Sequence, residues 1–231
     1  MRSKRVYSTL MALLLLFSAA FTTLLVVPLA SAQPWTTVRI IPCPMELGDN
    51  VTDIRGTTFD IAMVVENVTD LYGFDLQLKW DLTYLKYKSH TMTVPADSFP
   101  APNPPSPYSG ILHPTIMPVA NKVNESDEIP GANPGTLGFW AQSSMAPAPS
   151  FNGNGTVVVM EFEVKDQPFD AIEPLGVDVK IEFVSTDLAN STGDPIPHTA
   201  IDCNIHIWPR KFEYPPEPLL KVMPEDISGY E

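Results

Sequence analysis

The chain has 231 residues, of which 44% are hydrophobic and 18% are charged, with 25 prolines and 2 cysteines. This apolar content excludes an intrinsically disordered chain, and two cysteines exclude a small domain held together by several disulfides. The 14 basic and 27 acidic residues give a net charge of -13, which repels nucleic-acid phosphates and excludes a nucleic-acid partner.

The first 32 residues predict a secretory signal peptide. Three basic residues lie among the first five, and an uncharged apolar run follows from Val6 to Ala30. Ala30-Ser31-Ala32 presents the small residues that a signal peptidase recognises. The run is also long enough to cross a bilayer of about 30 Å as an uncleaved helix. We therefore expect a secreted or cell-surface protein, with membrane contact only if this segment stays uncleaved.

Export determines how the two cysteines are interpreted. In an oxidising compartment, Cys43 and Cys203 are most simply one disulfide that joins the start of the mature domain to its end. Two buried free thiols are the alternative. A zinc site is disfavoured because the ligand spacing of zinc motifs is missing.

Alternation of apolar and polar residues recurs along the mature chain. From Phe59 to Val65, for example, every second residue is large and apolar. Strands are predicted at 37–41, 58–65, 74–80, 158–164, 177–183 and 201–208. Residues 67–70 predict a connection between two neighbouring strands that each have one wet face, and Asn152-Gly153-Asn154-Gly155 predicts a tight turn.

No segment predicts a helix firmly; the best candidate, residues 82–87, is at least as prone to form a strand. Strands separated by turns, without helices between them, predict an all-β fold, a β-sandwich of two antiparallel sheets. We expect the sandwich to cover residues 33–208.

Two regions are rich in proline. Residues 95–135 predict a long irregular insertion, within which Ile111-Leu112 is apolar enough to pack back onto the sandwich. Residues 209–231 have the composition of a tail or linker.

Five Asn-x-Ser/Thr tripeptides are candidate N-glycosylation sites on an exported chain. They begin at Asn50, Asn67, Asn124, Asn154 and Asn190.

We find no motif for catalysis, metal binding or cofactor binding, and the four histidines have no metal-ligand spacing. We therefore expect neither an enzyme nor a cofactor. Exposed aromatic rings are the remaining chemical feature, because they stack on sugars. Trp80 lies on the same predicted strand face as the apolar residues of 74–80 and is therefore expected in the core. Trp140 and Trp208 are candidates for carbohydrate binding.

The ordered motifs resemble those of the cohesin domain, the receptor of the cohesin–dockerin pair. The resemblance runs over residues 38–208 and is carried mainly by two segments, 68–81 with its Gly73-Phe74 and Trp80-Asp81 pairs, and 155–164 with its final Phe162-Glu163-Val164. Asp187, Gly193 and Ile196 complete it.

The resemblance implies a jelly-roll β-sandwich whose first and last strands lie side by side, within disulfide reach of each other. It also implies a non-catalytic receptor for a dockerin-bearing protein, often a polysaccharide-degrading enzyme at a cell surface. The chain has no dockerin repeat, so the partner must be another chain. Two alternatives stay open: a carbohydrate-binding module for a polysaccharide, and a surface-structural subunit completed by the tail or an unpaired strand.

Overall fold

The computed structural model describes residues 35–49, 52–170 and 172–211. The predicted signal peptide, Asn50 and most of the predicted tail lie outside these residues. Within the described residues, no helix is long and apolar enough to span a bilayer.

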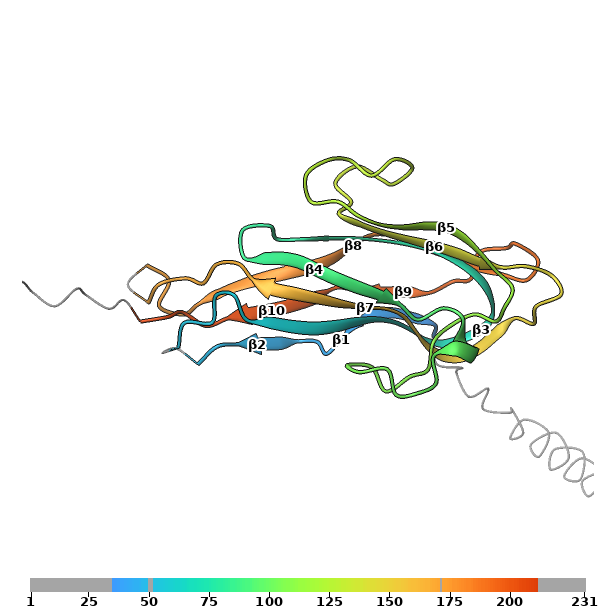
Figure 1. The fold of residues 1–231 in the computed structure, drawn as a ribbon, viewed down its shortest axis with the longest axis horizontal. Helices are drawn as coiled ribbons and strands as arrows, with labels where there is room; N and C mark the ends of the chain where they lie inside the picture. Colours follow the sequence, from blue (N-terminus) through green and yellow to red (C-terminus); the bar gives the residue numbers. More distant parts are fainter. Residues whose placement is uncertain (1–34, 50–51, 171, 212–231) are drawn as a thin grey trace, which may run out of the picture. The chain divides into compact units, whose positions relative to one another are not determined.

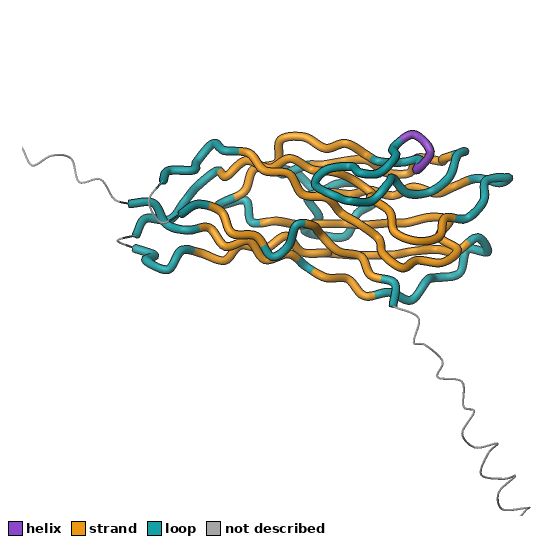
Figure 2. The backbone as a smooth tube through the Cα atoms, turned by 90° about the horizontal axis from the view of Figure 1, so that it is seen from below, coloured by secondary structure: helices purple, strands orange, loops and turns teal. Residues whose placement is uncertain are grey.

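The described residues form ten strands and one 3-10 turn, η1; Figures 1 and 2 show their arrangement. The elements are β1 Thr37–Ile41, β2 Met45–Leu47, β3 Thr58–Trp80, β4 Leu85–Met92, η1 Ala96–Ser98, β5 Ile116–Val123, β6 Gly138–Ser144, β7 Phe151–Val164, β8 Val177–Asn190, β9 Thr199–Ile201 and β10 Cys203–Ile207. The all-β prediction is confirmed.

The strands form one hydrogen-bonded sheet that curls into two layers, because β3 belongs to both. Its residues 58–71 pair with β7, and its residues 71–80 pair with β8. The first layer has the order β9-β1-β3-β7-β4, and the second has the order β2-β10-β8-β3-β6-β5. The two layers enclose one apolar core that holds residues from both.

The predicted break between two strands at residues 67–70 was wrong, because β3 continues through it. Asn67 and Asp70 have φ of 55° and 61°, a region that short polar side chains tolerate. The opposing strand is irregular at the same place. The backbone N–H of Asn67 donates to Asn154 Oδ1 (2.8 Å), and that of Asp70 donates to Asn152 Oδ1 (2.9 Å). The predicted tight turn at 152–155 is therefore part of β7.

The large apolar residues that the alternation placed on the inner face of β3 are buried in the core. Ile61, Met63 and Val65 are fully buried, as is Leu76 further along β3, and Trp80 is 5% exposed. Burying these side chains is the main source of stability in a sandwich of this kind, at about 1.5 to 3 kcal/mol for each large apolar side chain.

The proline-rich region 95–135 is more ordered than expected. Ile111 and Leu112 are fully buried in the core, as predicted. The region was wrongly described as irregular throughout, because it contains β5, which forms the edge of the second layer beside β6. Pro118 interrupts the apolar alternation of β5. Proline has no backbone N–H to donate to a neighbouring strand, so within a sheet it is found mainly on edge strands and at bulges. A bulge follows it.

The sequence predicts that the outer face of the first layer is exposed to solvent. Part of this face is covered instead. The loop 99–110 lays Tyr108 over Ala62, Val64 and Ile41. Glu66 fastens the loop: it accepts from both Nε and a terminal nitrogen of Arg39 (2.8 Å each) and from the hydroxyl of Tyr108 (2.5 Å). Hydrogen bonds from Arg39, and then from Tyr108, lower the pKa of Glu66 from 4.5 to about 2.

This shift gives a pH-dependent prediction. Because the folded pKa is depressed, the stabilisation from Glu66 is present above pH 4.5 and is lost as pH falls toward 2. We expect Glu66→Gln to lower the free energy of unfolding by about 2 kcal/mol at pH 7, and by progressively less below pH 4.5. Urea denaturation at pH 7, 4 and 3 measures this. Glu161→Gln is the control, since Glu161 accepts from the hydroxyl of Ser89 and forms no ion pair with the described residues. A difference between wild type and Glu66→Gln that does not change with pH would contradict the prediction.

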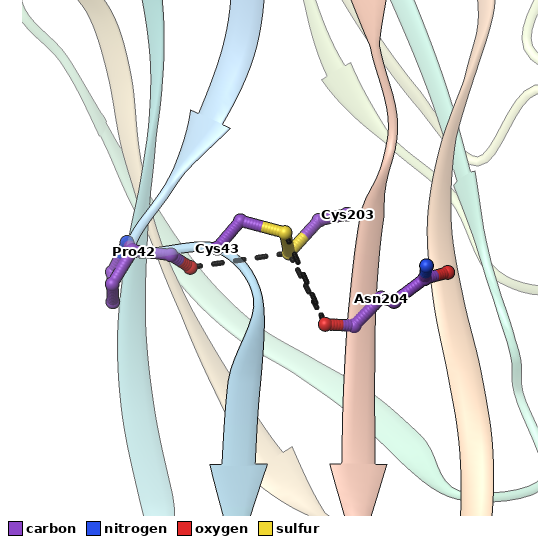
Figure 3. The surroundings of a disulfide bond; sticks show 4 residues. All are labelled: Pro42, Cys43, Cys203 and Asn204. Atoms are coloured by element: carbon purple, nitrogen blue, oxygen red, sulfur yellow. Dashed lines mark hydrogen bonds between the residues drawn. A yellow bond between two sulfur atoms is a disulfide. The ribbon is translucent and has the colours of Figure 1, made fainter.

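The two ends of the described chain run side by side and cross between the layers together. β1 pairs in parallel with β9 in the first layer, and β2 pairs in parallel with β10 in the second. Cys43 lies between β1 and β2, and Cys203 begins β10. The structure joins them in a disulfide with a Cα–Cα distance of 5.6 Å (Figure 3). The predicted bridge is confirmed.

Candidate functional site

The outer face of the second layer, on β8, β3, β6 and β5, carries the candidate site. Four small residues lie next to one another on this face: Gly73 pairs with Ala189 on β8 and with Ser143 on β6, and Ala141 lies two residues from Ser143 on β6, opposite Asp75. Larger side chains flank them, Val119 on one side and Pro195 on the other. The result is an open groove of about 370 Å³, which we call the β8/β3/β6 groove.

Two carboxylates line this groove. Asp75 on β3 lies directly opposite Asp187 on β8. Asp75 is half-buried, and its Oδ1 accepts from the side-chain amide of Gln77 (2.9 Å). Burial raises the pKa of Asp75, the Gln77 hydrogen bond opposes this, and the negative charge of Asp187 adds to the increase. Because the groove is only partly wet, its negative charge would be neutralised best by a cationic group.

An apolar rim borders the groove. Val119, at the β5 bulge, is 62% exposed and lines the groove. Met117 pairs with Ser143, which also lines the groove, so strand alternation places Met117 on the same face, and Met145 directly follows the end of β6. They are 46% and 39% exposed. Exposed apolar residues grouped beside a groove are typical of a protein-binding surface.

The loop 124–137 covers the neighbouring part of the same face; in Figure 1 it is the yellow-green loop between β5 and β6. Ile129 packs there with Phe139, Ala141 and Ala120. The side-chain oxygen of the buried Gln77 accepts from the backbone of Asn133 (2.8 Å) and the hydroxyl of Thr136 (3.1 Å). The loop therefore covers the part of the face on β6 and β3 that borders the groove.

Trp140 was wrong as a carbohydrate-binding candidate. Its side chain is fully buried between the layers, so it offers no ring face to a sugar. Trp140 lies on the face of β6 that points into the core, and the sequence pattern predicted no strand at this position. Trp208 is partly buried; its ring lies edge-on to His206 and its Nε1 donates to Glu46 Oε2 at 3.4 Å.

Four of the candidate glycosylation sites lie within the described residues, and each is exposed or half-buried. Asn67 and Asn154 are exposed, whereas Asn124 and Asn190 are half-buried. The side-chain oxygens of Asn124 and Asn190 accept backbone N–H groups of their own turns. Glycosylation of these asparagines stays a prediction.

The described residues contain no group of three or more histidine, cysteine, aspartate or glutamate side chains placed to hold a metal ion. The sequence reasoning missed Asp75, Asp187 and Val119. The alternation of 74–80 already placed Asp75 on the outer face, but only the pairing with β8 brings it opposite Asp187, and Val119 lay in the region predicted to be irregular.

Comparisons with known proteins give structural matches only. No family model matches the chain, and no curated protein matches it. The fold is similar to a non-cellulosomal cohesin from Archaeoglobus fulgidus, which is 10% identical with a TM-score of 0.46 over 75% of this chain and 91% of that one.

It is also similar to the cohesin of a type I cohesin–dockerin complex from Clostridium thermocellum (13% identical, TM-score 0.48, 75% and 99% covered). A third similar structure is the sixth cohesin of scaffoldin B from Acetivibrio cellulolyticus (13% identical, TM-score 0.46, 75% and 99% covered). Many of the solved structures with this likeness are cohesin domains, the family that the sequence motifs resemble.

Proposed function

We propose that the protein is an exported, non-catalytic receptor that binds a dockerin-bearing protein through the β8/β3/β6 groove and its apolar rim. The observation that carries this is the grouping of Met117, Val119 and Met145 beside the half-buried Asp75 and the exposed Asp187. Apolar contact area supplies affinity at such a surface, and the carboxylates select a partner with complementary charge.

The acidic groove indicates the chemistry of the partner surface. A lysine or arginine on the partner, flanked by apolar side chains, would neutralise Asp75 and Asp187 while its neighbours cover Val119 and the methionines. The strongly negative chain would also attract a basic partner over distance. A role in holding a polysaccharide-degrading enzyme at a cell surface belongs to the same proposal, and it follows from the cohesin resemblance of the sequence.

Export is the second part of the proposal and rests on the N-terminal segment. N-terminal sequencing of protein recovered from the medium tests it: a chain that begins at Gln33 supports cleavage and export. A chain found only in the cytoplasm with its leader intact would overturn this part.

The binding site is tested with the partner itself. The exported protein serves as bait in the culture medium of its own organism, and captured chains are identified by mass spectrometry; a chain with dockerin repeats is expected. Its affinity is then measured by calorimetry. Val119→Asp and Asp187→Lys should each weaken binding by about tenfold or more, because they place an unpaired charge or a like charge in the contact.

Ile201→Asp is the matched control for Val119→Asp. Ile201 is 47% exposed on β9 at the edge of the first layer, and we expect its replacement to leave the affinity unchanged. Equal loss in all three variants, or no loss in either groove variant, would remove the groove from the proposal. Retention of the protein on insoluble polysaccharide, without capture of any dockerin-bearing chain, would instead favour a carbohydrate-binding module.

A further inference from the structure

A buried amide lies between a hydroxyl and a carboxyl beneath the loop 124–137. The amide is that of Gln77 on β3, which is 4% exposed, and the hydroxyl is that of Thr136, which is 3% exposed. Thr136 Oγ1 donates to Gln77 Oε1 at 3.1 Å, and Gln77 Nε2 donates to Asp75 Oδ1 at 2.9 Å. The three side chains therefore bring together the nucleophile, the electrophile and the acid of an acyl transfer.

The carbonyl of the Gln77 amide is polarised at its oxygen. Besides the Thr136 hydroxyl, Oε1 accepts the backbone N–H of Asn133 at 2.8 Å. A backbone N–H in this position stabilises the negative charge that develops on the oxygen when a nucleophile adds to the carbonyl carbon. Because the amide is buried, this stabilisation is stronger than it is in water.

The Thr136 hydroxyl is held close to the carbon that it would attack. Its oxygen is 3.1 Å from Oε1, and a carbonyl bond is about 1.2 Å long, so Oγ1 lies no more than about 4.4 Å from Cδ of Gln77. The next residue, Leu137, fastens this part of the loop to β3, because its backbone N–H donates to Leu78 O at 2.8 Å. Reacting atoms meet at about 3–3.5 Å, so a shift of about 1 Å brings the hydroxyl into position.

Asp75 is placed to help the amide nitrogen leave. Burial raises the pKa of its carboxyl, which favours the protonated form, and its Oδ1 contacts Nε2 of Gln77 directly. A protonated carboxyl here gives its proton to the nitrogen, so that neutral ammonia is the leaving group. Asp75 also lines the open β8/β3/β6 groove, which gives the ammonia a path to solvent.

We propose that Thr136 and Gln77 join in an intramolecular ester. The hydroxyl oxygen adds to Cδ of Gln77 while its proton passes to Oε1, which gives a neutral tetrahedral intermediate. Asp75 then protonates Nε2, the C–N bond breaks, and the proton on Oε1 passes to the Asp75 carboxylate as the carbonyl re-forms. An alcohol and an amide thus become an ester and ammonia, without a reagent from outside the chain. This inference does not depend on the proposed function.

Burial distinguishes this site from a similar contact on the surface. Thr192 Oγ1 donates to Asn190 Oδ1 (2.8 Å) and to Asp194 Oδ2 (2.7 Å), so a hydroxyl, an amide and a carboxylate also meet there. Thr192 is exposed, and water weakens the same polar effects, so we expect no bond at that site. The buried ester is shielded from hydrolysis and locks the loop 124–137 onto β3 beside the groove.

Mass spectrometry of the folded wild-type protein, reduced and then digested with trypsin, tests the proposal. We expect peptides 56–79 and 123–165 to be recovered joined, lighter by one ammonia than their sum, with fragments that place the link at Gln77 and Thr136. Cyclisation of an N-terminal glutamine or of an Asn-Gly step also releases ammonia, but it joins no peptides. Recovery of the two peptides only as separate species of full mass would overturn the proposal.

Variants test the role of each group, with circular dichroism to confirm that each is folded. Thr136→Val keeps the shape of the side chain without the hydroxyl and should abolish the link, whereas Thr136→Ser should retain it. Asp75→Asn keeps an oxygen that accepts from Gln77 Nε2 but lacks the acidic proton, so the link should form at least about 100-fold more slowly in newly made, pulse-labelled protein. A link that persists in Thr136→Val would overturn the nucleophile, and an unchanged rate in Asp75→Asn would overturn the acid.

Discussion

Replacing both Cys43 and Cys203 by alanine should lower the free energy of unfolding by up to about 5 kcal/mol. The bridge closes a loop with a sequence separation of 160 residues. The chain-entropy model predicts this amount from the freedom that the open loop regains when the chain unfolds. Domains of this size are typically stable by only 5–15 kcal/mol, so the variant would lie near the limit of folding. Urea denaturation under non-reducing conditions measures the change.

The bridge also fixes where the terminal strands change layer. β1 and β9 lie in the first layer, and β2 and β10 continue them into the second, with the two cysteines at the change.

Alanine is chosen because Cys203 is fully buried and a serine hydroxyl there would add a desolvation cost of its own. Wild-type protein that is reduced and alkylated serves as the comparison, since it loses the same crosslink by another route. A loss below 1 kcal/mol in both samples would contradict the prediction.

Much of the fold could be predicted from the sequence because its core strands alternate clearly. The segments 58–65, 74–80 and 177–183 each place large residues on one face and polar ones on the other, and these segments are strands in the structure. The limits of the prediction have local causes. Asn67 and Asp70 carry a turn-like signal, yet their positive φ bends one strand instead of ending it.

Edge strands and grooves were harder to predict. β5 contains Pro118 and a bulge, so its alternation is broken and the strand was not predicted. Because the apolar rim of the groove lies partly on β5, the sequence could not predict the rim either. The pairing of Asp75 with Asp187 joins residues 112 positions apart, which no local pattern gives. Trp140 illustrates the reverse error: an aromatic residue in an unassigned region was interpreted as exposed, although its strand places it in the core.

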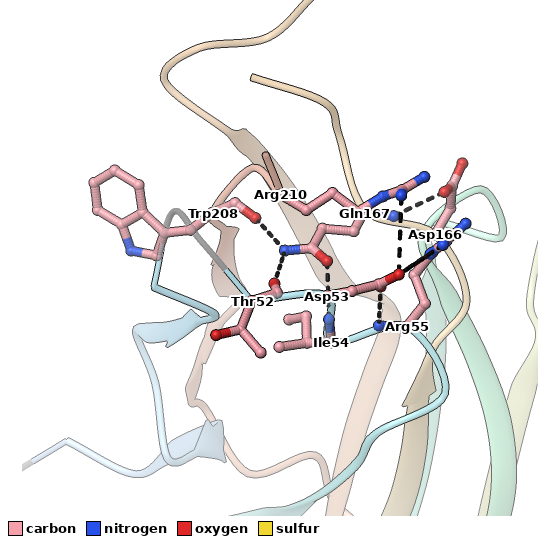
Figure 4. A network of polar contacts seen from close by, with 8 residues as sticks. All are labelled: Thr52, Asp53, Ile54, Arg55, Asp166, Gln167, Trp208 and Arg210. Atoms are coloured by element: carbon pink, nitrogen blue, oxygen red, sulfur yellow. Dashed lines mark hydrogen bonds and ion pairs between the residues drawn. The ribbon is translucent and has the colours of Figure 1, made fainter. Parts of the chain in front are cut away.

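The same limit applies to the end of the domain, where one glutamine joins three segments (Figure 4). Gln167 is 1% exposed. Its Oε1 accepts the backbone N–H of Ile54 (2.9 Å), and its Nε2 donates to Thr52 O (3.1 Å) and Trp208 O (2.8 Å). It thereby ties the loop before β3 to the segment after β10. Sequence alone gave no reason to single out this residue, because its partners are backbone atoms that lie 41 and about 115 positions away.

Gln167→Leu should therefore destabilise the domain by about 3 kcal/mol. Leucine keeps the volume but leaves an amide hydrogen and two carbonyl oxygens without their partner, and each unsatisfied buried group costs about 1–3 kcal/mol, less where water reaches it. Urea denaturation measures the loss.

Gln142→Leu is the matched control for this prediction. Gln142 is also largely buried, at 9% exposed, but its side chain makes no hydrogen bond to the described residues, so a change within about 0.5 kcal/mol is expected there. Equal losses at the two positions would show that burial of the amide, not its three backbone bonds, sets the effect.

Because residues 208–210 are held through Gln167, the leucine variant should also speed amide exchange at Asp170 and Arg210, whose backbone bonds depend on that segment. Unchanged exchange at both amides would mean that the Arg210 guanidinium, which lies over the Phe169 ring 3.7 Å from its centroid, holds the end of the domain without the glutamine.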